Sequence, residues 1–183
     1  MQLNERSEQS VLTAALAGDE RAFERIVRTN VDAVYGHALR FFGDTYAAED
    51  ATQEVFVKVF RSLGSFDGRS ALSTWIFRIT RNVCLDMARS GKRRPVPVDP
   101  ATLDVPSIRD FADDVVLSRS VEAAIRMLPP EERDALGAVT LFGLSYQDAS
   151  HSLGVPVGTV KSRVFRARRA LTALLEPAEE GAR

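Results

Sequence analysis

Residues 144–171 read LSYQDASHSLGVPVGTVKSRVFRARRAL, and this stretch predicts two helices joined by a tight turn. Ser145 is a residue type that caps helix N-termini, so a short helix can begin just after it. Gly154 ends that helix, because glycine enters the left-handed conformation at little cost. Pro156 cannot continue the first helix but can open the next, which we expect over about 157–175. The pattern is a helix-turn-helix, whose second helix enters the DNA major groove.

The second predicted helix carries charge of one sign only. No Asp or Glu occurs between Ala149 and Leu175, whereas a free surface helix normally mixes signs for i,i+4 support. The positively charged side chains of such a helix repel one another, so the helix needs an anionic partner. A solvated basic helix at a domain edge is the alternative, but the glycine turn, the cap and the lack of acids together favour nucleic acid. The basic residues are Lys161, Arg163, Arg166, Arg168 and Arg169.

The composition is ordinary for a globular protein, with 45% hydrophobic and 27% charged residues among 183, which leaves room for one or two small domains. The net charge of −1 excludes a uniformly basic nucleic-acid coat. We expect no transmembrane span and no secretory signal, because no apolar run is long enough and the N-terminus lacks a basic and then apolar pattern. A reducing cytoplasm is the expected location, with Cys84 in the core; redox sensing by Cys84 is the alternative.

Apolar residues recur at helical spacing along almost the whole chain, and no strand pattern or internal repeat occurs. The predicted fold class is all-α, with two small helical domains joined by an acidic linker that contains prolines. Residues 95–114 hold four prolines and five aspartates against one arginine, which is typical of an extended linker. The predicted boundaries are an N-terminal helical extension at 1–18, a first domain at 19–94, the linker at 95–114, a second domain at 115–176 and a tail at 177–183.

The helical pattern also predicts where individual side chains lie. His37 and His151 are expected to be exposed helix residues, because lone histidines are rarely ligands. The helix expected over 45–63 should bury one side, made of Ala48, Ala51, Thr52, Val55, Val59, Phe60 and Leu63.

Two separate motifs resemble one family. Either motif alone is only moderately specific, because helix-turn-helix sequences are common, but both in this order are highly specific. The motifs are AEDATQEVFVKVFRSLGSF at 48–66, continued by FDGRSALSTWIFRITRNVCLDMAR at 66–89, and GVPVGTVKSRVFRARRAL at 154–171. Together they resemble the bacterial sigma-70 family, in particular its small extracytoplasmic-function (ECF) class, over about residues 19–175.

The resemblance implies a division of labour between the domains. The first would correspond to sigma-2, which binds the coiled coil of the RNA polymerase β′ subunit and captures the promoter −10 element as single strand. The second would correspond to sigma-4, which reads the −35 element as duplex and touches the β flap. The implied partners are core RNA polymerase, promoter DNA and an anti-sigma factor. No cofactor and no metal are expected.

Melting a promoter requires capture of bases that have left the stack, for which aromatic side chains and basic residues are suited. Trp75 falls where larger relatives place a wedge aromatic; a core tryptophan beside Ile76 and Ile79 is the alternative. In ECF relatives the loop at 66–70 cradles a flipped base. The residues that the resemblance assigns to the −10 element are Phe66, Asp67, Arg69, Ser70, Trp75, Arg78, Arg81 and Asn82, with Arg89, Lys92, Arg93 and Arg94 adding positive charge.

The resemblance assigns two further sets of residues. Asp50, Gln53 and Glu54 match an acidic face that docks on basic residues of the β′ coiled coil; a helix-dipole role is the alternative. Four residues of the recognition helix align with groove-facing positions, and their spacing places them on one helical face. These are Lys161, Ser162, Phe165 and Arg166, whereas Arg163 and Arg169 are expected to meet phosphates.

The first helix of the helix-turn-helix departs from the family pattern. Ala149 and Ser152 replace larger apolar residues, and Ser150 replaces the usual alanine. This helix is therefore expected to bury less apolar surface, and the second domain to be marginal without a partner.

A stand-alone helix-turn-helix regulator is the alternative function. Such a protein needs a dimer interface or effector domain and a symmetric operator, and it has no use for an acidic docking face. An enzyme is not supported, because the sequence shows no glycine-rich phosphate loop, no metal-ligand spacing and no nucleophile elbow.

Overall fold

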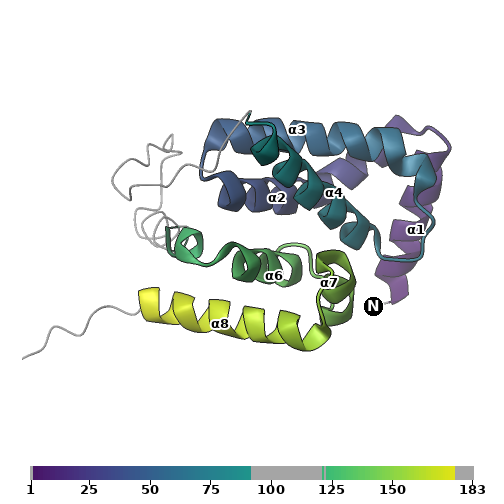
Figure 1. Cartoon of the computed structure of the whole chain (residues 1–183). Coiled ribbons are helices and arrows are strands. Elements are labelled where there is room, and N and C mark those ends of the chain that lie inside the picture. Colours follow the sequence, from purple (N-terminus) through teal and green to yellow (C-terminus); the bar gives the residue numbers. More distant parts are fainter. Residues whose placement is uncertain (1, 92–120, 122, 176–183) are drawn as a thin grey trace, which may run out of the picture.

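The computed structural model describes residues 2–91, 121 and 123–175, with side chains from residue 9 onward (Figure 1). The described residues form helices and turns and no strand, which confirms the all-α fold class. The predicted linker at 95–114, the tail at 177–183 and the basic residues 92–94 lie outside them. The elements are α1 (Gln2–Leu16), α2 (Glu20–Phe42), α3 (Thr45–Ser62), the 3₁₀ turn η1 (Leu63–Ser65), α4 (Leu72–Arg89), α6 (Pro130–Thr140), α7 (Tyr146–Leu153) and α8 (Val157–Leu175).

The first domain is built from α2, α3 and α4, with α1 packed against α2 (Figure 1). Side-chain caps start the two helices that follow α1. The Asp19 carboxylate accepts hydrogen bonds from the backbone N–H groups of Arg21 and Ala22, and Asp44 accepts one from Ala47 at 2.7 Å. The largest fully buried side chains of this core are Val34, Phe42, Val55, Val59, Ile76, Phe77, Thr80, Val83 and Cys84.

The second domain consists of α6, α7 and α8, preceded by a helical turn at residues 123–127. The Ser145 hydroxyl accepts a hydrogen bond from the Asp148 N–H at 3.1 Å, as the sequence predicts for an N-cap. Gly154 has a φ of 68°, the left-handed conformation that closes α7. The helix-turn-helix is thereby confirmed.

Two sequence predictions are wrong. His37 is buried, with 4% of its surface exposed, because the second domain packs over this part of α2, a contact that the periodicity of α2 does not reveal. Phe60 is 66% exposed, because the inward side of α3 is already formed by Val55, Val59 and their neighbours. Its ring instead packs edge-on against Phe23, with ring centroids 5.1 Å apart.

The two domains contact each other directly. Helix α4 packs against α7, and α2 against α6 (Figure 1). Buried apolar side chains form one cluster that includes residues of both domains. None of the described helices combines the length and apolarity that crossing a bilayer requires.

Candidate nucleic-acid interface

Helix α8 separates its residues into a buried stripe and an exposed face. Val160, Val164 and Ala167 point into the second domain and are buried. The opposite side is solvent-exposed, and its Phe165 keeps 67% of its surface accessible. We call this side the reading face, made of Lys161, Ser162, Phe165 and Arg166. Arg169 is also exposed further along the helix, and Arg163 is half-buried at its edge.

Neighbouring groups orient three side chains of the reading face. The Lys161 ammonium lies 5.9 Å from the centre of the Tyr146 ring, a cation–π distance. The Ser162 hydroxyl donates to the Thr159 carbonyl at 2.9 Å. The Arg166 Nε donates to Oε1 of Glu132 at 2.6 Å. The sequence did not reveal Glu132 as a partner, because it lies 34 positions from Arg166 and no local motif links the two.

In the first domain, Phe66 and Trp75 pack together at the start of α4. Their ring centroids are 5.3 Å apart and tilted by 53°. Both rings are partly buried and rest against the core. Trp75 therefore has features of both sequence alternatives, since one part of the indole packs inward and another part reaches solvent.

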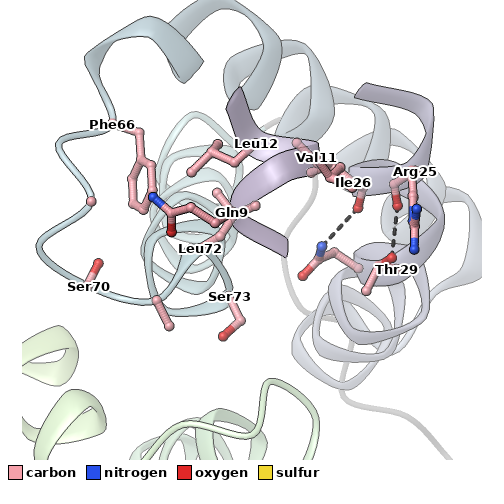
Figure 2. A pocket seen from close by; sticks show the side chains of 13 residues that line it. Gln9, Val11, Leu12, Arg25, Ile26, Thr29, Phe66, Ser70, Leu72 and Ser73 are labelled. Carbon is pink, nitrogen blue, oxygen red and sulfur yellow. Dashed lines mark hydrogen bonds between the residues drawn. The ribbon is translucent and has the colours of Figure 1, made fainter. Parts of the chain in front are cut away.

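A cavity of about 540 Å³ opens beside this aromatic pair (Figure 2). Phe66, Ser70 and Leu72 line it from the loop and α4, and Gln9 lines it from α1. Across the cavity, Asn30 of α2 donates to the Ile26 carbonyl at 2.8 Å. The volume lies within the range of small-molecule sites. Sequence reasoning did not identify the walls from α1 and α2, because elements distant in the sequence create this cavity and no motif marks it.

The other residues assigned to the −10 element do not all lie together. Arg78 and Asn82 are exposed on the side of α4 that also carries Trp75. Arg81 instead points toward the second domain and pairs with Asp134. In the loop, the Arg69 Nε lies 3.3 Å from a carboxylate oxygen of Asp67, and both side chains are largely exposed.

The solvent side of α3 combines acidic, polar and apolar residues. Asp50, Gln53 and Glu54 are exposed, and Glu54 lies 3.9 Å from Lys58. Three large apolar side chains share this side of the helix and are also exposed. They are Tyr46 at 69%, Val57 at 40% and Phe60 at 66%.

Cys84 and His151 are the remaining groups that could react or bind a metal. Burial raises the pKa of the Cys84 thiol to about 12, so the thiol stays protonated and unreactive. His151 is exposed, as predicted. Within the described part of the chain, no three His, Cys, Asp or Glu side chains gather as a metal site would require.

Both domains match family models of known proteins, and curated relatives match nearly the whole chain. Residues 26–94 match the family model of Sigma-70 region 2, and residues 118–171 match that of Sigma-70, region 4. RNA polymerase sigma-H factor of Pseudomonas aeruginosa is 34% identical, over 96% of this chain and 97% of the relative. The ECF RNA polymerase sigma factor SigM of Mycobacterium tuberculosis is 37% identical, over 94% of this chain and 86% of the relative.

Two solved structures are similar in fold. One is CnrH in complex with the cytosolic domain of CnrY, with a TM-score of 0.68 and 27% identity over 92% of this chain and 97% of that chain. The other is the sigma factor RpoE in complex with the anti-sigma factor NepR from Bartonella quintana, with a TM-score of 0.69 and 27% identity over 85% of this chain and 98% of that chain. The chain therefore belongs to the ECF class of sigma-70 family RNA polymerase sigma factors, and it acts in transcription initiation rather than as an enzyme or a stand-alone helix-turn-helix regulator.

Proposed function

We propose that this chain binds core RNA polymerase through α3 and directs it to promoters by reading the −35 element with α8 and the −10 element with the loop and α4. The observation that carries the proposal is the reading face. Phe165 is 67% exposed and stands among cations on a helix-turn-helix, where it suits a DNA groove, because aromatic and apolar side chains contact base edges there.

The −35 element is proposed to bind to α8 in the major groove. Lys161 and Arg166 can donate to base edges, and Phe165 can contact a thymine methyl group. Arg163 and Arg169, at the margins of the reading face, are proposed to grip phosphates and set the register. The Arg166–Glu132 pair is solvent-accessible on the arginine side, at 56%, so DNA can compete for the guanidinium.

The −10 element is proposed to bind as single strand along the loop and α4. The Phe66–Trp75 pair offers a stacking platform, and the adjacent cavity offers room for an unstacked base. Arg78 and Asn82 lie on the same side of α4 and are placed to follow the backbone. Asp67, Arg69 and Ser70 are proposed to shape the loop.

Core polymerase is proposed to dock on the exposed side of α3. Asp50, Gln53 and Glu54 supply negative charge and hydrogen-bonding groups for the basic β′ coiled coil, and the exposed apolar side chains beside them supply buried area. The β flap is proposed to contact the second domain. Because polymerase acts on the chromosome, we place the protein in the cytoplasm.

An anti-sigma factor is proposed as a further partner. Support comes from the similar structure of RpoE, whose title names the anti-sigma factor NepR as its partner. No described residue of this chain is assigned to that contact.

The test is reconstituted transcription with purified core polymerase and a library of genomic fragments. We expect promoter-specific transcripts only when chain and core are both present. The double variant Asp50→Arg, Glu54→Arg should weaken binding to core because it sets like charges against the basic coil, while circular dichroism should show native helicity. A matched control is Glu20→Arg, Glu24→Arg on exposed positions of α2. If the native chain neither co-purifies with core nor adds transcripts, the proposal fails.

A further inference from the structure

Glu132 of α6 is a sheltered carboxylate that lies against the exposed side of α8. Its side chain is 12% exposed, whereas the Arg166 side chain that it contacts is 56% exposed. Oε1 of Glu132 accepts a hydrogen bond from Nε of Arg166 at 2.6 Å. Helix α8 contains no acid of its own. The reading face is therefore in contact with a negative charge that comes from a different helix.

The hydrogen bond to Glu132 uses one edge of the Arg166 guanidinium. A guanidinium has five N–H donors in a rigid planar fork. Glu132 takes the Nε–H, and this bond leaves the four N–H groups of the two terminal nitrogens. The outer end of the fork presents one N–H from each terminal nitrogen, which is the arrangement that pairs with O6 and N7 of guanine in the major groove. Arg166 can therefore bind a base while Glu132 still holds Nε.

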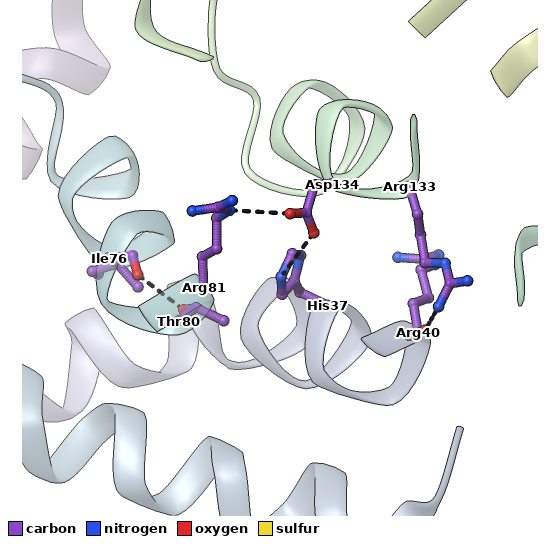
Figure 3. A network of polar contacts seen from close by, with 7 residues as sticks. All are labelled: His37, Arg40, Ile76, Thr80, Arg81, Arg133 and Asp134. Carbon is purple, nitrogen blue, oxygen red and sulfur yellow. Dashed lines mark hydrogen bonds and ion pairs between the residues drawn. The ribbon is translucent and has the colours of Figure 1, made fainter. Parts of the chain in front are cut away.

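The turn of α6 that carries Glu132 is itself held in place. The next residue, Arg133, donates hydrogen bonds to the carbonyls of Arg126 and Leu128 at 2.8 and 2.9 Å, which ties α6 to the helical turn before it. Arg133 also donates to the carbonyl of Arg40 in the last turn of α2 at 2.6 Å (Figure 3). The carboxylate of Glu132 therefore extends from a fixed backbone, as a group that orients another side chain must.

Holding an arginine changes what it can recognise. A free Arg166 could turn toward a phosphate, and a phosphate contact binds DNA without reading its sequence. An arginine held at Nε has fewer orientations, so it loses less freedom when it meets a matching base. The acid also repels the DNA backbone, which weakens binding wherever the arginine finds no matching base. Both effects favour discrimination between bases over general affinity for DNA.

We propose that Glu132 is a positioning residue for readout of the −35 element: it holds Nε of Arg166 so that the outer end of the guanidinium meets a guanine. Glu132 does not contact DNA and acts through Arg166 alone. This inference rests on the proposed function, because it requires α8 to read the −35 element. The hold on Arg166 in the free chain does not depend on that function and can be measured separately.

The experiment measures base preference with the full chain bound to core polymerase. The template is a promoter recovered from the genomic fragments, with its −35 element randomised, and transcripts are counted for each base at each position. One position should prefer guanine and lose that preference in Arg166→Ala. Glu132→Ala should lower the guanine preference severalfold at the same position and leave the other positions unchanged. Glu131→Ala, at an exposed position of the same turn, should change no preference.

Two further variants separate positioning from a purely structural role. Glu132→Gln keeps a side-chain oxygen that can accept from Nε, so it should restore most of the guanine preference. Glu132→Ala combined with Arg166→Ala should match Arg166→Ala alone, because the acid acts through the arginine. A further loss of preference in the double variant would overturn the proposal. So would a Glu132→Ala variant that lowers output on all −35 sequences alike, or that raises output on all of them with the guanine preference intact.

Nuclear magnetic resonance of the free full chain tests the hold itself. The Nε–H proton of Arg166, identified by its loss in Arg166→Ala, should exchange slowly with water in the native chain and in Glu131→Ala. In Glu132→Ala it should exchange severalfold faster. Equal exchange rates in the native chain and Glu132→Ala would show that the acid does not hold Arg166, and the inference would be wrong. If Glu132 protects the proton but the native chain with core gives no promoter-specific transcripts, the hold stands and the proposed promoter function fails.

Discussion

The contact between the two domains and the reading face each set an arginine against an acid of α6, in different surroundings. In the Arg166–Glu132 pair the arginine side chain is 56% exposed and the glutamate 12%, whereas in the Arg81–Asp134 pair the arginine is 29% exposed and the aspartate 17%. An exposed pair contributes about 0–1 kcal/mol and is screened by salt, while a sheltered pair is screened less. The two pairs therefore differ in their arginines: the guanidinium of Arg166 is accessible to DNA, whereas that of Arg81 is more sheltered.

The largest difference in unfolding free energy is expected between alanine substitutions of two phenylalanines in the second domain. Phe142→Ala removes a side chain that is buried against Phe77 of the first domain and should lower the free energy of unfolding by about 3–5 kcal/mol. Phe165→Ala removes an exposed ring and should change stability by no more than about 0.5 kcal/mol, yet weaken binding to −35 duplex. Urea titration followed by circular dichroism measures both. Equal, small changes would show that the first domain does not hold Phe142.

The two histidines should differ in their effect on pH-dependent stability. Burial lowers the pKa of His37 to about 4, against the opposing effect of Asp134 and with help from Arg40, Arg81 and Arg133. The folded chain thus binds the proton less tightly than the unfolded chain, whose histidine has a pKa near 6.5.

It follows that the stabilising effect of neutral His37 is complete above pH 6.5 and is lost as the pH falls toward 4. At pH 5 the loss is about 2 kcal/mol. His37→Gln should flatten this part of the curve of unfolding free energy against pH, and His151→Gln, at an exposed position, should not. Parallel curves for the native chain and His37→Gln would mean that the imidazole is not shielded.

The smallest difference is expected between alanine substitutions of two arginines of α8, in how each changes promoter preference. Arg166→Ala should flatten the −35 preference in a promoter library, because a base contact supplies about 1–3 kcal/mol of discrimination. Arg169→Ala should instead lower output nearly uniformly, because a phosphate contact weakens all sequences alike. If neither substitution alters the preference, the reading face has been placed on the wrong side of the helix.

Family membership and most of the local structure could be predicted from the sequence alone. Asp19 and Ser145 cap helices as their residue types suggest, and Gly154 adopts the left-handed conformation that its position requires. These features depend on residues within a few positions of each other, so their signals survive without knowledge of the fold. The shared exposed side of Lys161, Ser162, Phe165 and Arg166 could be predicted for the same reason, since one helix carries all four; their contact with DNA stays a prediction.

Only the tertiary structure decided which side chains from distant elements meet. His37 is buried and Arg81 is paired because α6 lies across α2 and α4, and Phe60 is exposed because the core of the first domain closes without it. The cavity beside Phe66 likewise needs a wall from α1. Periodicity shows that a helix has an inward side, but it does not show what covers the rest of the helix. That depends on contacts between residues far apart in the chain, which no local pattern records.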